Sequence, residues 1–193
     1  MSAGKNIYMR HENTLDAAQT ALVIIDMQDA FRASISDFAE VAVRIALMAH
    51  AAQLLGVPVI VTEQYPKGLG HTAGEIRAVL PEALEFIEKT AFSSCGAQEF
   101  VAQLERHGAR QVLVCGIEAH VCVNQTTHDL LARGYQVHLL TECITARAEH
   151  NRQTGLAKMQ QSGARSSSIE MALFELMRDA AHKQFKAVQK LIK

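Results

Sequence analysis

The chain has 193 residues, of which 49% are hydrophobic and 20% charged, and 19 basic against 20 acidic residues give a formal net charge of −1. This composition is typical of a globular protein and excludes a disordered or fibrous chain. The nearly balanced charge also argues against general binding to nucleic acid or to an anionic membrane, so we expect neither as a partner. At ~100–200 residues per domain, the length predicts a single domain over residues 1–193.

Membrane spans and disulfides are not indicated either. The longest apolar runs, such as Leu22–Ile25 and Val57–Val61, are far shorter than the ~20 residues that a spanning helix needs. The segment Met1–Asn6 has no hydrophobic signal core, so we expect no secretion. The cysteines form no Cys-x-x-Cys pair and are too few for a disulfide framework: Cys95, Cys115, Cys122 and Cys143. We therefore expect free thiols and a cytoplasmic protein.

Short runs of β-branched residues alternate with helical patterns along the chain. Ala21–Asp26 opens with a continuous apolar run, which predicts a strand covered on both faces. Apolar residues then recur at helical spacing between Asp37, the expected N-cap, and Gly56, the expected stop. Val57–Thr62 predicts a second buried strand. The polar segment Gln64–Gly74 is too long for a simple turn, and we interpret it as a functional or lid loop.

The alternation continues to the C-terminus. Further strands are predicted near Thr90–Ser93 and at Gln111–Gly116, Tyr135–Thr141 and Ser166–Ser168. Further helices are predicted at about Glu75–Val79, Gln98–His107, Val121–Arg133, His150–Gln161, Glu170–Arg178 and Ala181–Ile192. Such alternation predicts an α/β fold: a three-layer α/β/α sandwich with a mostly parallel, doubly wound, Rossmann-like central sheet. Ligands of such sheets bind outside the carboxyl ends of the strands.

Three chemically interesting residues lie near predicted strand ends. Asp26 follows the first strand and is either a site carboxylate or an ordinary loop or cap residue. Cys122 opens a predicted helix, where free N–H groups and the helix dipole favour a thiolate and could form an oxyanion hole; the alternative is a buried structural cysteine. Lys89 precedes a predicted strand and, taken alone, is typical of a surface charge. His120 lies two residues from Cys122 and could be considered as its general base. Side chains at this spacing do not face each other in a helix, which disfavours that role.

Several familiar motifs are missing from the sequence. It contains no G-x-G-x-x-G, no G-x-x-x-x-G-K-[ST] and no G-x-S-x-G. A nucleotide cofactor and a serine nucleophile are therefore not indicated.

Three motifs in this order resemble those of the isochorismatase-like cysteine hydrolase superfamily. They are Leu22–Phe31, Lys89 with Phe92 and Ser93, and Gly116–Val123. Within the superfamily, the chain is most similar to the isochorismatase domain-containing proteins, through Thr62–Gly70 and the C-terminal Phe174–Lys193. The resemblance spans roughly residues 15–180 and implies the α/β/α fold of that superfamily.

The resemblance implies a catalytic triad of Asp26, Lys89 and Cys122. Cys122 would attack the carbonyl carbon of a small amide, so that a C–N bond is cleaved through a covalent thioester. The resemblance also implies a non-proline cis peptide between Ile117 and Glu118. This bond is expected to turn a backbone N–H, that of Ala119, toward the substrate oxygen beside the N–H of Cys122.

The resemblance also bears on the substrate pocket, on metals and on assembly. We expect the pocket to be shaped by Gln28, Phe31, Gln64, Phe92 and Ala119. Some members bind a metal through an Asp-x-His after the second strand, where this chain has Gln64 and Pro66, so we expect no metal and no cofactor. We expect a small-molecule substrate and a homo-oligomer.

Other functions stay open at this point. One is hydrolysis of another small molecule, including an isochorismate-like ether. Another is a catalytically silent scaffold that binds a protein partner, although Asp26 and Lys89 would then be costly to bury without a role. A thiol redox sensor at Cys122 is disfavoured because no resolving cysteine lies at a recognisable spacing.

Overall fold

The computed structural model describes residues 10–193. The segment Met1–Asn6, on which the expectation of no secretion rests, lies outside the described residues. Within residues 10–193, none of the helices combines the length and the apolar character needed to cross a membrane.

In the part of the chain that the structure describes, six parallel strands form one sheet in the order β3-β2-β1-β4-β5-β6. The strands are β1 (Thr20–Ile25), β2 (Val59–Gln64), β3 (Ile87–Lys89), β4 (Gln111–Gly116), β5 (Gln136–Ile144) and β6 (Arg165–Ser167). The strand order reverses at β1, between β2 on one side and β4 on the other. This switch point is where a doubly wound sheet leaves a crevice for a ligand.

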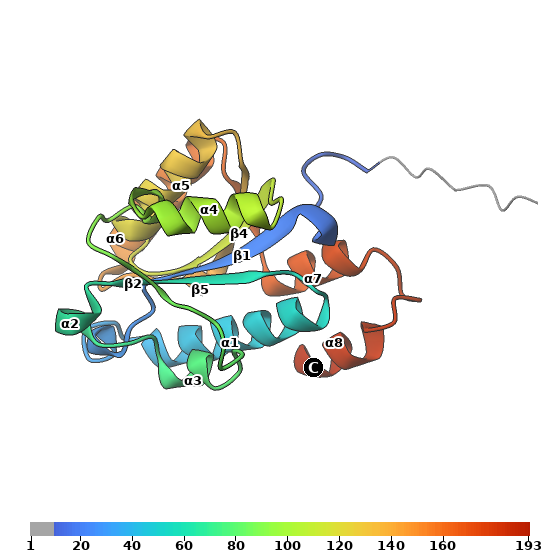
Figure 1. The fold of residues 1–193 in the computed structure, drawn as a ribbon, viewed down its shortest axis with the longest axis horizontal. Helices are drawn as coiled ribbons and strands as arrows, with labels where there is room; N and C mark the ends of the chain where they lie inside the picture. Colours follow the sequence, from blue (N-terminus) through green and yellow to red (C-terminus); the bar gives the residue numbers. More distant parts are fainter. Residues whose placement is uncertain (1–9) are drawn as a thin grey trace, which may run out of the picture.

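Helices cover both faces of the sheet (Figure 1). One face carries α1 (Phe38–Leu54), α3 (Gly74–Arg77), α7 (Ile169–Met177) and α8 (Phe185–Leu191). The other face carries α4 (Gln98–Arg106), α5 (Cys122–Ala132) and α6 (Glu149–Gln161). A short helix, α2 (Pro66–Leu69), lies in the connection that follows β2. The predicted α/β/α sandwich is confirmed.

The core forms because the central strands are apolar on both sides. In β1, Leu22 and Ile24 pack toward α1, whereas Val23 and Ile25 pack toward α4 and α5, and all four are fully buried. Burial of each such side chain contributes about 1.5–3 kcal/mol to the free energy of folding, relative to an exposed side chain. Packing on both faces thus fixes the position of β1, and with it the position of the residue that follows the strand.

One local prediction is wrong, and the structure adds detail to two others. The strand predicted near Thr90–Ser93 lies at Ile87–Lys89, because a three-residue edge strand has too few residues to show a period. The segment Gln64–Gly74, interpreted as a functional or lid loop, contains the short helix α2. Asp37 lies at the N-cap position of α1 but makes no capping bond; its carboxylate accepts a hydrogen bond from the Thr145 hydroxyl at 2.6 Å instead.

Gly116, the last residue of β4, has no room for a side chain. Its φ is +114°, and a Cβ built there would lie 2.0 Å from the carbonyl oxygen of Ile25. We expect Gly116→Ala to lower the free energy of unfolding by about 3 kcal/mol or more, since it combines an unfavourable φ with overpacking against backbone. Gly134→Ala is the control, because Gly134 has a φ of +83° but nothing within 4 Å of a Cβ. Urea denaturation measures both; equal losses would show that the close approach to β1 does not matter.

Candidate active site

Asp26, Lys89 and Cys122 come from three different elements and meet at the carboxyl ends of the strands. Asp26 follows β1 directly in the left-handed region, at φ +50°, and its N–H donates to the Thr62 carbonyl at 3.1 Å. Lys89 is the last residue of β3, and Cys122 is the first residue of α5. The Lys89 ammonium lies 2.6 Å from Oδ2 of Asp26, and both side chains are almost fully buried. Because open α/β sheets bind their ligands at such a switch point, these side chains form a candidate functional site.

The Lys89 ammonium is surrounded by oxygen atoms. Besides Asp26, it donates to Oε1 of Gln64 at 2.6 Å and to the carbonyl oxygens of Ala91 at 3.1 Å and Phe92 at 3.0 Å. A buried ion pair is tolerated only when such additional hydrogen bonds replace lost hydration. The carbonyls of residues 91 and 92 turn toward this ammonium, which explains why Thr90–Ser93 does not extend β3.

Thr62 fixes the second oxygen of Asp26. Its hydroxyl donates to Oδ1 of Asp26 at 2.7 Å, and its side chain is fully buried. Sequence reasoning missed this residue. A signal was available, because Thr62 is a polar residue in the strand β2, which pairs with β1 beside Asp26.

The Cys122 thiol is protonated at neutral pH, contrary to the prediction of a thiolate. Burial, followed by the negative charge of Asp26, raises the pKa of the Cys122 thiol to about 12, and the opposing effect of Lys89 is too small to offset them. The helix-start position therefore does not by itself activate this cysteine. Asp26 lies beside the thiol and can take up its proton.

The backbone before Cys122 agrees with the prediction in one respect and differs from it in another. The peptide bond between Ile117 and Glu118 is cis. The N–H of Ala119, however, donates to the Thr145 carbonyl at 2.9 Å, so it does not point toward a substrate. Among residues 10–193, no acceptor contacts the N–H of Glu118 or that of Cys122. The N–H groups of Glu118 and Cys122, two residues that line the cavity beside the thiol, are thus unpaired within the described part of the chain, whereas that of Ala119 is not.

A cavity of about 330 Å³ opens onto Asp26 and Cys122. Its walls are mainly apolar and are formed by Phe31, Leu69, Phe92, Ile117 and Val121. Gln64 also lines it, so three of the five side chains predicted to shape the pocket, Phe31, Gln64 and Phe92, lie there. The volume suits a small molecule.

The other two predicted pocket residues do not line this cavity. Gln28 is fully buried, and its amide holds the backbone that follows β2, donating to the Gln64 and Gly70 carbonyls at 3.0 and 2.7 Å. Ala119 is fully buried beneath α6, where a Cβ on Gly155 would lie 2.7 Å from the Ala119 carbonyl oxygen. Both residues were predicted from their neighbours in sequence, which does not reveal the direction of a side chain.

One charged pair forms part of the cavity wall and was not predicted as such. Arg147, which follows β5, donates through Nε to Oε1 of Glu118 at 2.9 Å, and its backbone N–H donates to the same oxygen at 3.1 Å. Burial raises the pKa of Glu118, but these bonds from Arg147 outweigh burial and hold the pKa below its usual value. Glu118 is therefore ionised, and its charge is matched by Arg147.

Comparison with known proteins identifies the family. A family model described as an isochorismatase domain matches residues 20–171. The chain belongs to the isochorismatase family. It is 46% identical over 173 residues to isochorismatase domain-containing protein 2 of Macaca fascicularis, which covers 89% of this chain and 82% of that one. It is 39% identical over 182 residues to a secreted isochorismatase effector, Isc1, of Phytophthora sojae, covering 90% of this chain and 84% of the effector.

A solved structure agrees with this family membership. The structure described as the MAR1 ribonuclease from Caenorhabditis elegans superposes with a TM-score of 0.88 and 38% sequence identity, over 93% of this chain and 92% of the nematode chain. The resemblance drawn from the three sequence motifs is thereby confirmed at the level of the family. The family supports assignment as a hydrolase.

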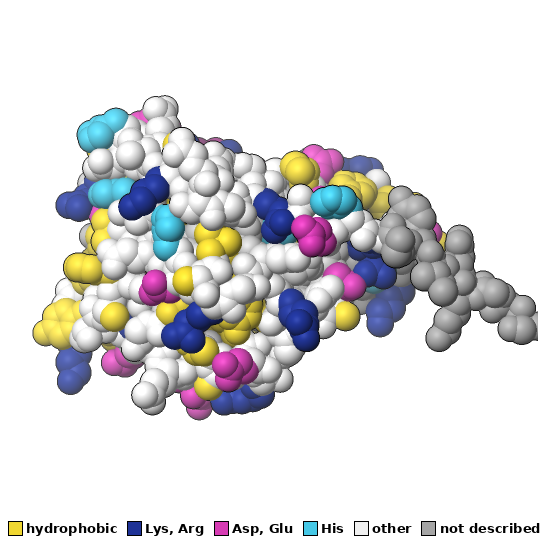
Figure 2. Space-filling model, turned by 90° about the horizontal axis from the view of Figure 1, so that it is seen from above, with side chains coloured by type: hydrophobic (Ala, Val, Ile, Leu, Met, Phe, Trp, Pro, Cys, Tyr) yellow, Lys and Arg dark blue, Asp and Glu magenta, His cyan; other side chains and the backbone are white. Residues whose placement is uncertain are grey.

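The face of the molecule shown in Figure 2 has mixed charge. On the face shown in Figure 2, Lys and Arg side chains alternate with Asp and Glu side chains, and no large area of that face has a single sign. This agrees with the net charge of −1. A nucleic-acid site would require basic residues gathered in one area.

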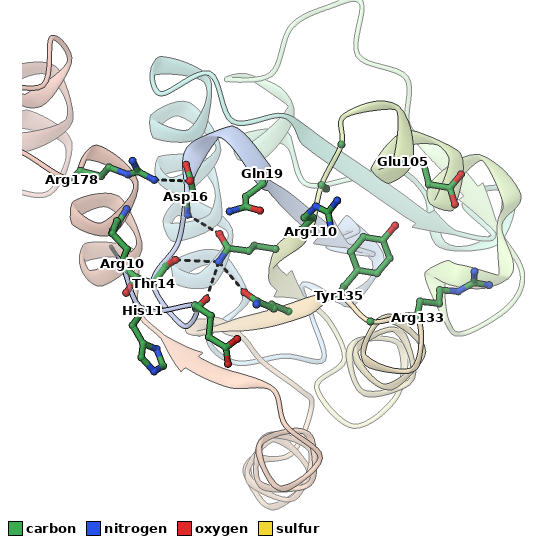
Figure 3. Close-up of a pocket in the computed structure, with 16 residues that line it drawn as sticks. Arg10, His11, Thr14, Asp16, Gln19, Glu105, Arg110, Arg133, Tyr135 and Arg178 are labelled. Carbon is green, nitrogen blue, oxygen red and sulfur yellow. Dashed lines mark hydrogen bonds and ion pairs between the residues drawn. The ribbon is translucent and has the colours of Figure 1, made fainter. Parts of the chain in front are cut away.

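A larger cavity, of about 700 Å³, lies at the opposite end of the sheet, at the amino ends of β1, β4 and β5 (Figure 3). It is lined by charged side chains, among which Arg178 pairs with Asp16 at 2.6 Å. None of Asp26, Lys89 and Cys122 borders it. The smaller cavity is the candidate site because it holds the thiol and the carboxylate, although it is not the larger of the two.

Proposed function

We propose that the protein is a cysteine hydrolase that cleaves a C–N bond of a small amide-like substrate without a cofactor. The observation that carries this proposal is the arrangement around Asp26. One carboxylate oxygen is held by Lys89 and the other by Thr62, next to a protonated thiol that opens onto a small apolar cavity. A carboxylate fixed in this way can accept a proton from the thiol and return it later.

In the first half-reaction, the Cys122 sulfur attacks the substrate carbonyl carbon while its proton passes to Asp26. The carbonyl electron pair moves to oxygen, and the N–H groups of Cys122 and Glu118 stabilise the oxyanion. The intermediate then collapses: the C–N bond breaks, the departing nitrogen takes the proton from Asp26, and a thioester remains on Cys122.

In the second half-reaction, water releases the product. Asp26 accepts a proton from water while the water oxygen attacks the thioester carbon. When the C–S bond breaks, the sulfur recovers that proton and the acid leaves. Lys89 donates a hydrogen bond to Asp26 and keeps it in position between the two steps. Each proton is thus accounted for by Asp26 and Cys122.

Hydrolysis of RNA is the second candidate, because the nematode relative is described as a ribonuclease and matches over most of the chain. The cavity favours acyl chemistry over this alternative. Its walls are apolar, and Arg147 at its edge is already paired with Glu118. A phosphodiester would need cations that are free to contact phosphate.

The test is turnover on a panel of small amides, a vinyl ether and a short RNA, combined with mass spectrometry of the intact protein. We expect release of amine or ammonia from at least one amide and, after rapid acid quenching, an acyl adduct that maps to Cys122. Cys95→Ser is a matched control that should leave both the release of amine or ammonia and the acyl adduct unchanged, because Cys95 does not line this cavity. Cleavage of RNA with no amide turned over would favour the second candidate.

A further inference from the structure

Two ion pairs account for the charges in and beside the catalytic cavity. Asp26 is paired with Lys89 at 2.6 Å, and Glu118 is paired with Arg147 at 2.9 Å. The Cys122 thiol is neutral. The two carboxylates and two cations cancel, so the cavity offers an incoming molecule no unpaired charge.

The Glu118–Arg147 pair is asymmetric. The Glu118 side chain is only 7% exposed, whereas that of Arg147 is 59% exposed. The carboxylate is therefore part of the wall, and the guanidinium neutralises it from the solvent side. Loss of Arg147 would leave a buried negative charge facing the cavity, and loss of the Glu118 charge would leave a positive one.

The other side chains of the wall offer an ion no counter-charge, and the one polar amide among them, that of Gln64, is already bonded to Lys89 and to the Thr90 carbonyl. Phe31, Leu69, Phe92, Ile117 and Val121 provide apolar surface, so a charged group that enters loses hydration and gains no counter-ion. An uncharged amide loses far less.

We propose that the Glu118–Arg147 pair keeps this cavity electrically neutral and thereby selects uncharged acyl substrates. The substrate class is then a small neutral amide with an apolar acyl group, and amides that carry a carboxylate or an ammonium are excluded. This inference rests on the proposed function only in taking Cys122 as the reacting group.

The experiment compares two electrophiles of nearly equal size that differ in charge. Iodoacetamide is neutral and iodoacetate is an anion. The rates at which the two reagents alkylate Cys122 are measured by peptide mass spectrometry at pH 8.5. The ratio of the iodoacetamide rate to the iodoacetate rate is then divided by the same ratio for 2-mercaptoethanol, and the result is the preference for iodoacetamide. The negative charge of the attacking sulfur disfavours iodoacetate in every variant. The test is therefore the difference between variants in their preference for iodoacetamide.

We expect Glu118→Gln, which keeps the side-chain shape, to lower the preference for iodoacetamide by about tenfold relative to the unmodified protein, as one unit of charge near the thiol would do. Arg147→Gln should raise that preference by about tenfold for the opposite reason. The double variant Glu118→Gln with Arg147→Gln is neutral again and should return to the unmodified value. This return separates a charge effect from a change of shape.

The inference is overturned if both single variants shift the preference in the same direction, or if the double variant resembles either of them. Should Arg147→Gln fail to fold, the comparison of Glu118→Gln with the unmodified protein decides alone, and no change there also overturns the inference. Alkylation does not depend on turnover, so the two proposals fail separately. If no amide is hydrolysed but the alkylation pattern is as expected, only the proposed function is contradicted.

Discussion

Replacing Lys89 with methionine is expected to abolish turnover and to lower the free energy of unfolding by about 3–5 kcal/mol, the usual cost of removing one partner from a buried ion pair. The ammonium that the variant loses contacts Asp26, Gln64 and two carbonyl oxygens. Asp26 would then be a buried carboxylate without its counter-charge. Urea denaturation and the rate on a substrate from the amide panel measure the two effects.

Two controls distinguish the ion pair from a general effect of losing a lysine. Lys158→Met removes an exposed lysine of α6 and should change stability by less than about 0.5 kcal/mol. The double variant Lys89→Met with Asp26→Asn removes both charges, so we expect it to recover stability but not turnover. A Lys89→Met protein that keeps near-normal activity would rule out the proposed triad.

Replacing Cys122 with serine is expected to lower kcat by at least about 10³-fold, because removal of a nucleophile leaves only binding and the oxyanion donors. So small a change should leave the other residues of α5, such as Thr126, in place, and the free energy of unfolding should stay within about 1 kcal/mol of the original. The acyl adduct should also disappear from mass spectra. An adduct that persists on another cysteine would contradict the assignment.

The pH dependence of the same thiol gives an independent test. Because the pKa of Cys122 is raised to about 12, the thiolate fraction should grow with pH throughout the accessible range. We expect the rate of alkylation of Cys122 by iodoacetamide to rise about tenfold per pH unit from pH 7 to pH 10, without the plateau near pH 9 of an ordinary thiol with a pKa of about 8.5. A plateau below pH 8 would show that the free enzyme holds a thiolate.

The fold was predictable because its central strands are apolar on both faces and its long helices are strongly periodic. The range of β4 was predicted without error, and α1, α4 and α6 within about two residues, which is the usual uncertainty of a helix end. The short edge strand β3 was misplaced because three residues carry no period. Its last residue, Lys89, was nevertheless identified through the resemblance to the family.

That Asp26, Lys89 and Cys122 lie together could be predicted from the sequence, whereas the electrostatics around them could not. Position at strand ends pointed to Asp26 and Cys122, yet the thiolate prediction was wrong because burial depends on neighbours that are distant in sequence. The free N–H of Ala119 was predicted from its place in the motif, whereas its acceptor, the Thr145 carbonyl, follows another strand. Glu118 and Arg147 lie 29 positions apart, and no local pattern reveals such a pair.

The amide of Gln28 joins two parts of the protein that perform different tasks. Its Nε2 donates to the carbonyl oxygens of Gln64 and Gly70, and its Oε1 accepts the N–H of Gln64. The Gln64 side chain contacts the Lys89 ammonium, while Gly70 directly follows Leu69 in the cavity wall. The cavity wall at Leu69 and the cation that contacts Asp26 thus share one mechanical support. Under the proposed function, a ligand that displaced Leu69 would strain the same amide that keeps Gln64 on Lys89, and the shape of a substrate would then affect the geometry of proton transfer.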